Sequence, residues 1–277
     1  MENINYGMGA TESPKDDRTF TYAPTKSNKK GGERWLPKYI DHQHKVGICT
    51  GISKTMRGGN NYNKKFSAEF QYLCQKKFFD LNWEEGSSIF YAIKVAKNIG
   101  LLPVEEWTWT TEEDRNLPYS EYIKKLQAIP DSEIDRLKLI AANYKVKAYA
   151  SVPIDRDSLA NAIDDSDALL VRFSVGNEWF TAPIEPLRPP VNPISGHAVN
   201  LTNYDGNSFR IANSWGTDWA DEGTAYFLFN SYKPTEAWAV WFEDVPEEIQ
   251  KQIDLKAIKD LCDDAIGKIN QIKVAIQ

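Results

Sequence analysis

Apolar residues change their spacing part-way along this chain. From residue 35 to about residue 130 they recur three or four positions apart, which is typical of amphipathic helices. This spacing predicts helices over residues 50–57, 67–79 and 89–99, with another at 134–142. The later chain instead holds short alternating runs, which predict strands over residues 146–152, 168–175, 196–204, 208–213, 224–230 and 237–242. The sequence therefore predicts an α+β fold.

This pattern divides the chain into four parts. Residues 1–35 are polar and rich in Gly, Ser, Lys, Asn and Asp, and they are interpreted as a flexible N-terminal arm. Residues 36–133 are predicted to form a helical lobe and residues 134–245 an antiparallel β-barrel lobe. Residues 246–277 repeat apolar positions alternately three and four apart, which predicts an amphipathic helix. That helix either packs on its own protein or binds a partner or a second copy.

Composition narrows the class of protein. Of the 277 residues, 42% are hydrophobic and 26% charged, as in ordinary globular proteins. The net charge is −6, and no basic block is interleaved with aromatic residues, so we expect no nucleic-acid partner. No run approaches about 18 apolar residues, so we expect no membrane span. The first 20 residues lack the basic and apolar regions of a secretory signal.

Three cysteines occur, Cys49, Cys74 and Cys262. An odd number, spread widely along the chain, does not suit a disulfide framework. We therefore expect a cytoplasmic or other reducing compartment. Cys74 and Cys262 have no reactive residues near them in the sequence and are interpreted as packing residues.

Cys49 and His197 are the candidate nucleophile and base. A thiol attacks carbonyl groups as the thiolate, which a helix N-terminus or a nearby imidazole stabilises. Cys49 follows Gly47-Ile48 at a predicted helix start, while His197 enters an apolar strand. An Asn carbonyl such as that of Asn213 can orient a His ring through one of its nitrogens.

These residues carry a resemblance to the papain-like cysteine peptidases. Gly-His-Ala-Val from Gly196, followed by Asn-Ser-Trp-Gly from Asn213, resembles the family's motifs in content and spacing. The resemblance extends with gaps over residues 35–245. It implies a helical lobe and a β-barrel lobe with the active site between them. It also implies an oxyanion-hole role for Gln43, backbone contact with substrate at Gly86, and shielding of the His–Asn pair by Trp215.

Two features depart from the family. Cys49 stands between Ile48 and Thr50 instead of in the usual Gly/Ser-Cys-Trp signature, so the pocket shape is altered. Cys74 matches a disulfide cysteine of secreted members, but its partner is missing. These departures favour a bacterial or phage-associated source. No inhibitory propeptide of familiar length precedes Trp35, so either residues 1–35 block the cleft, or specificity is narrow, or partners confine the enzyme.

The sequence thus predicts a cysteine endopeptidase that hydrolyses peptide bonds of a peptide or protein substrate without a cofactor. Cys49, His197, Asn213 and Gln43 are the predicted catalytic residues, and Gly86 and Trp215 the predicted substrate-binding ones. One alternative is a non-catalytic papain-like subunit attached through its C-terminal helix. Another is an acyl transferase using the same thiol. A zinc site from His42, His44 and Cys49 lacks a fourth ligand.

Overall fold

The computed structural model describes residues 6–16, 19–23, 36–181, 186–244, 265–266 and 268. It divides the chain into two units, Met1–Glu243 and Asp244–Gln277. The helix predicted over residues 246–277 lies almost wholly outside the described residues. Within that range only Ala265, Ile266 and Lys268 are described, and they are helical. Across the described part of the chain, no helix is long and apolar enough to cross a membrane.

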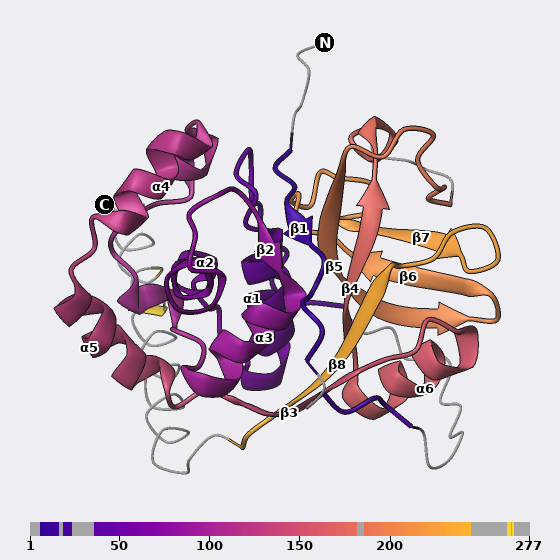
Figure 1. Ribbon diagram of the computed structural model, residues 1–277, viewed down its shortest axis with the longest axis horizontal. Coiled ribbons are helices and arrows are strands. Elements are labelled where there is room, and N and C mark those ends of the chain that lie inside the picture. The colour runs from indigo at the N-terminus through magenta and orange to yellow at the C-terminus, as the bar shows by residue number, and fades with distance from the viewer. Residues whose placement is uncertain are drawn as a thin grey trace. The chain divides into compact units, whose positions relative to one another are not determined.

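Helices form one half of the first unit (Figure 1). They are α1 (Cys49–Tyr62), α2 (Ala68–Gln75), α3 (Ile89–Asn98), α4 (Tyr119–Gln127) and α5 (Asp131–Ala141). The side chain of Ser67 caps α2 by accepting a hydrogen bond of 3.1 Å from Phe70 N, which satisfies one free amide at the helix start. Apolar residues of α1, α2, α4 and α5, including Ile52, Leu73 and Leu137, share one buried core.

The other half is a six-stranded sheet in the order β3-β8-β4-β5-β6-β7, with every neighbouring pair antiparallel. The strands are β3 (Val146–Ser151), β4 (Leu169–Val175), β5 (Ser195–Asp205), β6 (Ser208–Ala212), β7 (Thr224–Leu228) and β8 (Glu236–Phe242). The α+β class and both element types are as predicted. Within the described residues, however, the sheet closes no barrel, because β8 inserts between β3 and β4 and leaves β3 and β7 as opposite edges.

Two helices have no counterpart in the sequence prediction, α4 and α6 (Arg156–Ser166). The start of α6 is fixed by Asp155, whose side chain accepts a hydrogen bond of 2.9 Å from Ser158 N. Two of its buried apolar residues are alanines, which give a weak hydrophobic signal. Leu159 and Ile163 are the larger ones, and they join the core of the sheet half.

A short N-terminal strand lies between the two halves (Figure 1). This strand, β1 (Ala10–Thr11), pairs in parallel with β2 (Ser87–Ser88), which immediately precedes α3. A third buried cluster joins the halves here, and it contains Ala10, Cys49 and Ala198. The predicted nucleophile therefore lies at the junction of helices and sheet, with part of the N-terminal arm against it.

Candidate active site

Cys49 is the first residue of α1, and its side chain is fully buried. Its N-cap, Ile48, supplies no side-chain hydrogen bond, so backbone N–H groups of the first turn are left to stabilise a negative charge. Burial raises the pKa of the Cys49 thiol to about 11. Hydrogen bonds from the backbone N–H groups of Ala198, Thr50 and Ala10 act in the opposite direction. In this closed site the thiol is therefore neutral.

His197 lies on β5, and its ring is fixed by Asn213, which follows β6. The Nε2 atom of His197 lies 2.7 Å from Oδ1 of Asn213. The backbone N–H of Ser214 also donates to that oxygen at 2.8 Å, which identifies it as the acceptor end of the amide. Nε2 of His197 must therefore carry the proton. Nδ1 keeps its lone pair, is buried, and has no hydrogen-bond partner among the described residues.

The environment of His197 is dry and aromatic. Trp215 stacks on the imidazole with ring centroids 4.7 Å apart, and Trp179 meets it edge-on at 6.1 Å. Burial lowers the pKa of His197 to about 4, and the hydrogen bond with Asn213 partly offsets this. The ring is therefore neutral at neutral pH, which is the state that a general base requires.

Gln43 is completely buried beside the site. Its side-chain Nε2 donates to Gly7 O and, at 3.2 Å, to Val46 O. The hydroxyl of Ser214 donates to the other end of the amide, Oε1, and so fixes which end points at Gly7. Gln43 thus holds an oriented N–H donor toward a peptide carbonyl, as an oxyanion hole requires. Ser214, a motif residue with no predicted role, is what orients it.

Arg115 holds the segment that carries Gln43, a role that nothing in its local sequence indicates. Its guanidinium is buried and donates to Asp41 Oδ1 at 2.9 Å, to Glu69 Oε1 at 2.7 Å and to His42 O at 2.6 Å. Burial raises the pKa of Asp41, but Arg115 outweighs it and holds that pKa below its usual value. Two carboxylates from distant segments are therefore tied to one cation next to Gln43.

Gly86 immediately precedes β2, and its backbone N–H and C=O are both already hydrogen-bonded. Its N–H donates to the hydroxyl of Tyr72 at 3.0 Å, and its C=O accepts from Lys76 Nζ at 2.7 Å. The next N–H along the chain, that of Ser87, donates to Gly9 O at 2.9 Å. What matters at Gly86 is the absence of a side chain, because a Cβ there would lie 2.0 Å from Gly9 O.

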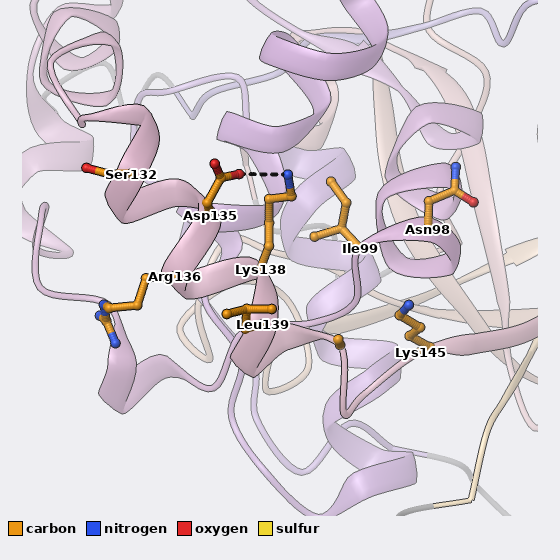
Figure 2. A pocket seen from close by; sticks show the side chains of 9 residues that line it. Asn98, Ile99, Ser132, Asp135, Arg136, Lys138, Leu139 and Lys145 are labelled. Carbon is orange, nitrogen blue, oxygen red and sulfur yellow. Dashed lines mark hydrogen bonds and ion pairs between the residues drawn. The ribbon is translucent and has the colours of Figure 1, made fainter.

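Two other features of the molecule lack the groups of a metal or catalytic site. His42 and His44, the ligands of the zinc hypothesis, stack on each other with centroids 3.9 Å apart. No group of three or more His, Cys, Asp or Glu among the described residues could hold a metal ion. The groove shown in Figure 2 lies along α5 and contains an ion pair between Lys138 and Asp135, but neither His nor Cys lines it.

Comparison with solved structures shows what this architecture resembles. Xylellain, a cysteine protease from Xylella fastidiosa, superposes with a TM-score of 0.71 and 24% identity, covering 86% of this chain and 96% of that one. The fold is papain-like. Procathepsin L 3 from the larval midgut of Tenebrio molitor gives a TM-score of 0.61 at 14% identity, covering 86% of this chain and 77% of its own.

ProCathepsin B S9 from Trypanosoma congolense gives a TM-score of 0.60 at 14% identity, with coverages of 87% and 88%. No protein-family model and no curated protein sequence matches the chain. The papain-like fold thus rests on structure, at identities too low to transfer an activity. What this chain can do depends on the side chains that the fold brings together.

Proposed function

We propose that this chain is a cysteine endopeptidase with Cys49 as nucleophile and His197 as general base. The observation that carries the proposal is the state of His197, whose Nε2–H is donated to Asn213 while Nδ1 is buried and unpaired. Ala198, the next residue, lies in the same buried cluster as Cys49 at the start of α1. A base with a free lone pair therefore immediately precedes, on β5, a residue that shares this cluster with the thiol.

The reaction begins when Nδ1 of His197 takes the thiol proton and the Cys49 sulfur bonds to the substrate's carbonyl carbon. The oxyanion that forms accepts hydrogen bonds from the Gln43 side chain and the Cys49 backbone N–H. His197 then gives its proton to the leaving amine as the C–N bond breaks, which leaves a thioester. Water, deprotonated by His197, hydrolyses the thioester and restores the thiol.

A peptidyl epoxide tests this proposal. We expect prolonged incubation to attach one inhibitor to the full chain at Cys49, as read by peptide mass spectrometry. Cys49→Ala removes the adduct, whereas Cys74→Ala, which alters an equally buried thiol, retains it. Hydrolysis of a fluorogenic protein substrate should fall in the same pattern. If iodoacetamide reaches Cys49 but the epoxide does not react and no substrate is cleaved, the chain is a non-catalytic papain-like subunit.

A further inference from the structure

The ring of His42 closes a tight turn around Gln43. The backbone N–H of His44 donates to Nδ1 of His42 at 2.9 Å. Nδ1 is as many bonds from Cα as Oδ1 of Asn is, so this contact reproduces an Asx turn, in which a side chain accepts from the N–H two residues later. His44 has a φ of +51°, which is uncommon for residues other than glycine. Gln43 therefore lies in a tight turn that the His42 side chain closes.

The ring of His42 is packed between residues from three parts of the chain. The ring of His44 stacks on it with centroids 3.9 Å and planes 20° apart. The ring of Tyr6 lies 5.6 Å away at a tilt of 50°. Gly216, the last residue of the Asn-Ser-Trp-Gly motif, lies so close that a Cβ there would be 2.6 Å from Cδ2 of His42. These contacts leave the ring little freedom to turn away from the His44 N–H.

The turn sets the position from which the Gln43 side chain extends. The backbone N–H of Gln43 donates to Ser214 O at 2.9 Å. The side chain then reaches Val46 O with Nε2 and the Ser214 hydroxyl with Oε1. In the proposed reaction that Nε2–H is donated to the oxyanion, and such a donor must lie about 2.7–3.1 Å from the oxygen. Movement of the turn would therefore move the donor out of range.

The hydrogen bond that closes the turn requires one state of His42. Because Nδ1 accepts, the ring must be neutral with its proton on Nε2. Protonation places an N–H on Nδ1, so that two donors face each other and the bond breaks. Burial lowers the pKa of His42, and His44 and Arg115 act in the same direction, whereas Glu112 and Asp41 oppose them. The titratable and charged groups around the ring are Asp41, His44, Glu112, Arg115 and Tyr6, on which Asp218 acts in turn.

From this arrangement we infer that His42 is a positioning residue for the oxyanion donor: its neutral ring closes the turn that places the Gln43 side chain, and protonation of the ring opens that turn. The inference rests on the proposed function for the role of Gln43, but the turn can be measured without catalysis. It makes activity depend on the protonation of a second histidine besides the base, His197.

NMR of the full chain labelled with ¹⁵N-histidine tests the turn directly, because the chain contains only three histidines. At neutral pH we expect His42 to show a protonated Nε2 and an unprotonated Nδ1, with a scalar coupling from Nδ1 to the backbone nitrogen of His44 across the hydrogen bond. The coupling should disappear as the ring is protonated in acid. His42→Asn assigns the His42 ring signals by their loss. A proton on Nδ1 at neutral pH would overturn the inference, whether or not the chain cleaves peptides.

The side-chain amide of Gln43, labelled with ¹⁵N-glutamine, reports the position of the donor without catalysis. Its signal should move in His42→Ala, which removes the acceptor. It should stay in place in His42→Asn, whose Oδ1 can accept the same N–H. An unmoved signal in His42→Ala would overturn the inference. If both NMR results are as expected but wild type cleaves no substrate, the proposed function is wrong and the turn is confirmed.

Cleavage of a fluorogenic protein substrate tests whether His42 acts through Gln43. We expect His42→Ala to lower kcat/KM by about tenfold at neutral pH, and His42→Asn to retain it. Lys45→Ala changes an exposed residue of the same segment and is the matched control, with kcat/KM unchanged. The double variant His42→Ala/Gln43→Ala should be no slower than Gln43→Ala, because the donor is already absent. Losses that multiply would show a general structural role and overturn the inference.

The pH profile separates His42 from His197. In wild type, kcat/KM should fall in acid through protonation of both rings, whereas in His42→Asn it should fall through His197 alone. The variant should therefore keep its activity to lower pH and lose it with a shallower slope. Coincident acid limbs in the two chains would show that protonation of His42 does not reach the donor, which contradicts the inference.

Discussion

The two sides of the candidate active site are held in place by different interactions. On the sheet side, His197 lies in a regular ladder, opposite Phe173 of β4, and the same strand pairs with β6 just before Asn213. On the helix side, the segment before Cys49 is irregular and is tied down by side chains. Arg115 binds Asp41 and Glu69, and Glu85 accepts the Gly47 N–H at 2.8 Å.

This difference predicts unequal tolerance to mutation. A ladder distributes the position of one residue over many backbone hydrogen bonds, so that no single side chain controls it. A buried ion network concentrates that control in a few charges, and removing one leaves the others buried without compensation. Single substitutions should therefore disturb the nucleophile side of this site more than the base side.

The largest effect is expected from Arg115→Met. The substitution leaves the carboxylates of Asp41 and Glu69 buried without their cation, which costs about 3–5 kcal/mol of unfolding free energy. Urea unfolding measures this change. Arg136→Met is the matched control, because Arg136 is half-exposed and its pair with Glu133 is worth at most about 1 kcal/mol. Equal losses in the two variants would remove the basis of the comparison.

The sequence predicted the sheet side of the site better than the helix side. The spacing from His197 to Asn213 is set by two adjacent strands, which alternation and turn residues reveal directly. The Arg115 network depends on Asp41, Glu69 and Arg115 meeting in space, and nothing in their local sequence indicates it. For a similar reason, the sequence does not reveal that the sheet stays open. Whether a sheet closes depends on the order of its strands, and that order is set by contacts between residues far apart in the sequence.

The packing of the N-terminal arm is a further feature that the sequence does not predict. Its sequence is polar and glycine-rich, as flexible segments often are. Two of these glycines, Gly7 and Gly9, instead lie so close to Val46 O and Gly86 Cα that a Cβ would not fit. Composition alone does not separate a glycine that confers freedom from one that permits close contact. For Gly86, the resemblance implied backbone contact with a substrate, whereas its own N–H and C=O are bonded to Tyr72 and Lys76.

Gln43→Ala sharpens the comparison on the helix side. It should lower kcat/KM for a fluorogenic protein substrate by about 10²–10³, as expected for losing one oxyanion donor. Gln127→Ala, on the exposed end of α4, should leave kcat/KM unchanged. A fall of less than about threefold for Gln43→Ala would mean that the donor does not act on the oxyanion.

Burial of neutral His197 makes stability depend on pH. Its pKa is about 4 in the folded chain and near 6.5 when unfolded, so the unfolded chain binds more protons between these values. The stabilisation is complete above pH 6.5 and is lost as the pH falls, by roughly 3 kcal/mol at pH 4. Unfolding curves of wild type and His197→Gln should diverge accordingly. Parallel curves from pH 6.5 to 4 would show that the ring is not buried in its neutral form.

The smallest effect is expected at Asn213, because the ladder also positions His197. Asn213→Ala should remove one buried hydrogen bond, worth about 1–3 kcal/mol, and so lower kcat/KM by about 5- to 150-fold. Asn213→Asp keeps an acceptor for Nε2–H and should recover most of this loss. It should also shift the acidic limb of the pH profile upward by favouring the imidazolium. If Asn213→Ala changes neither rate nor profile, the ladder alone orients the base.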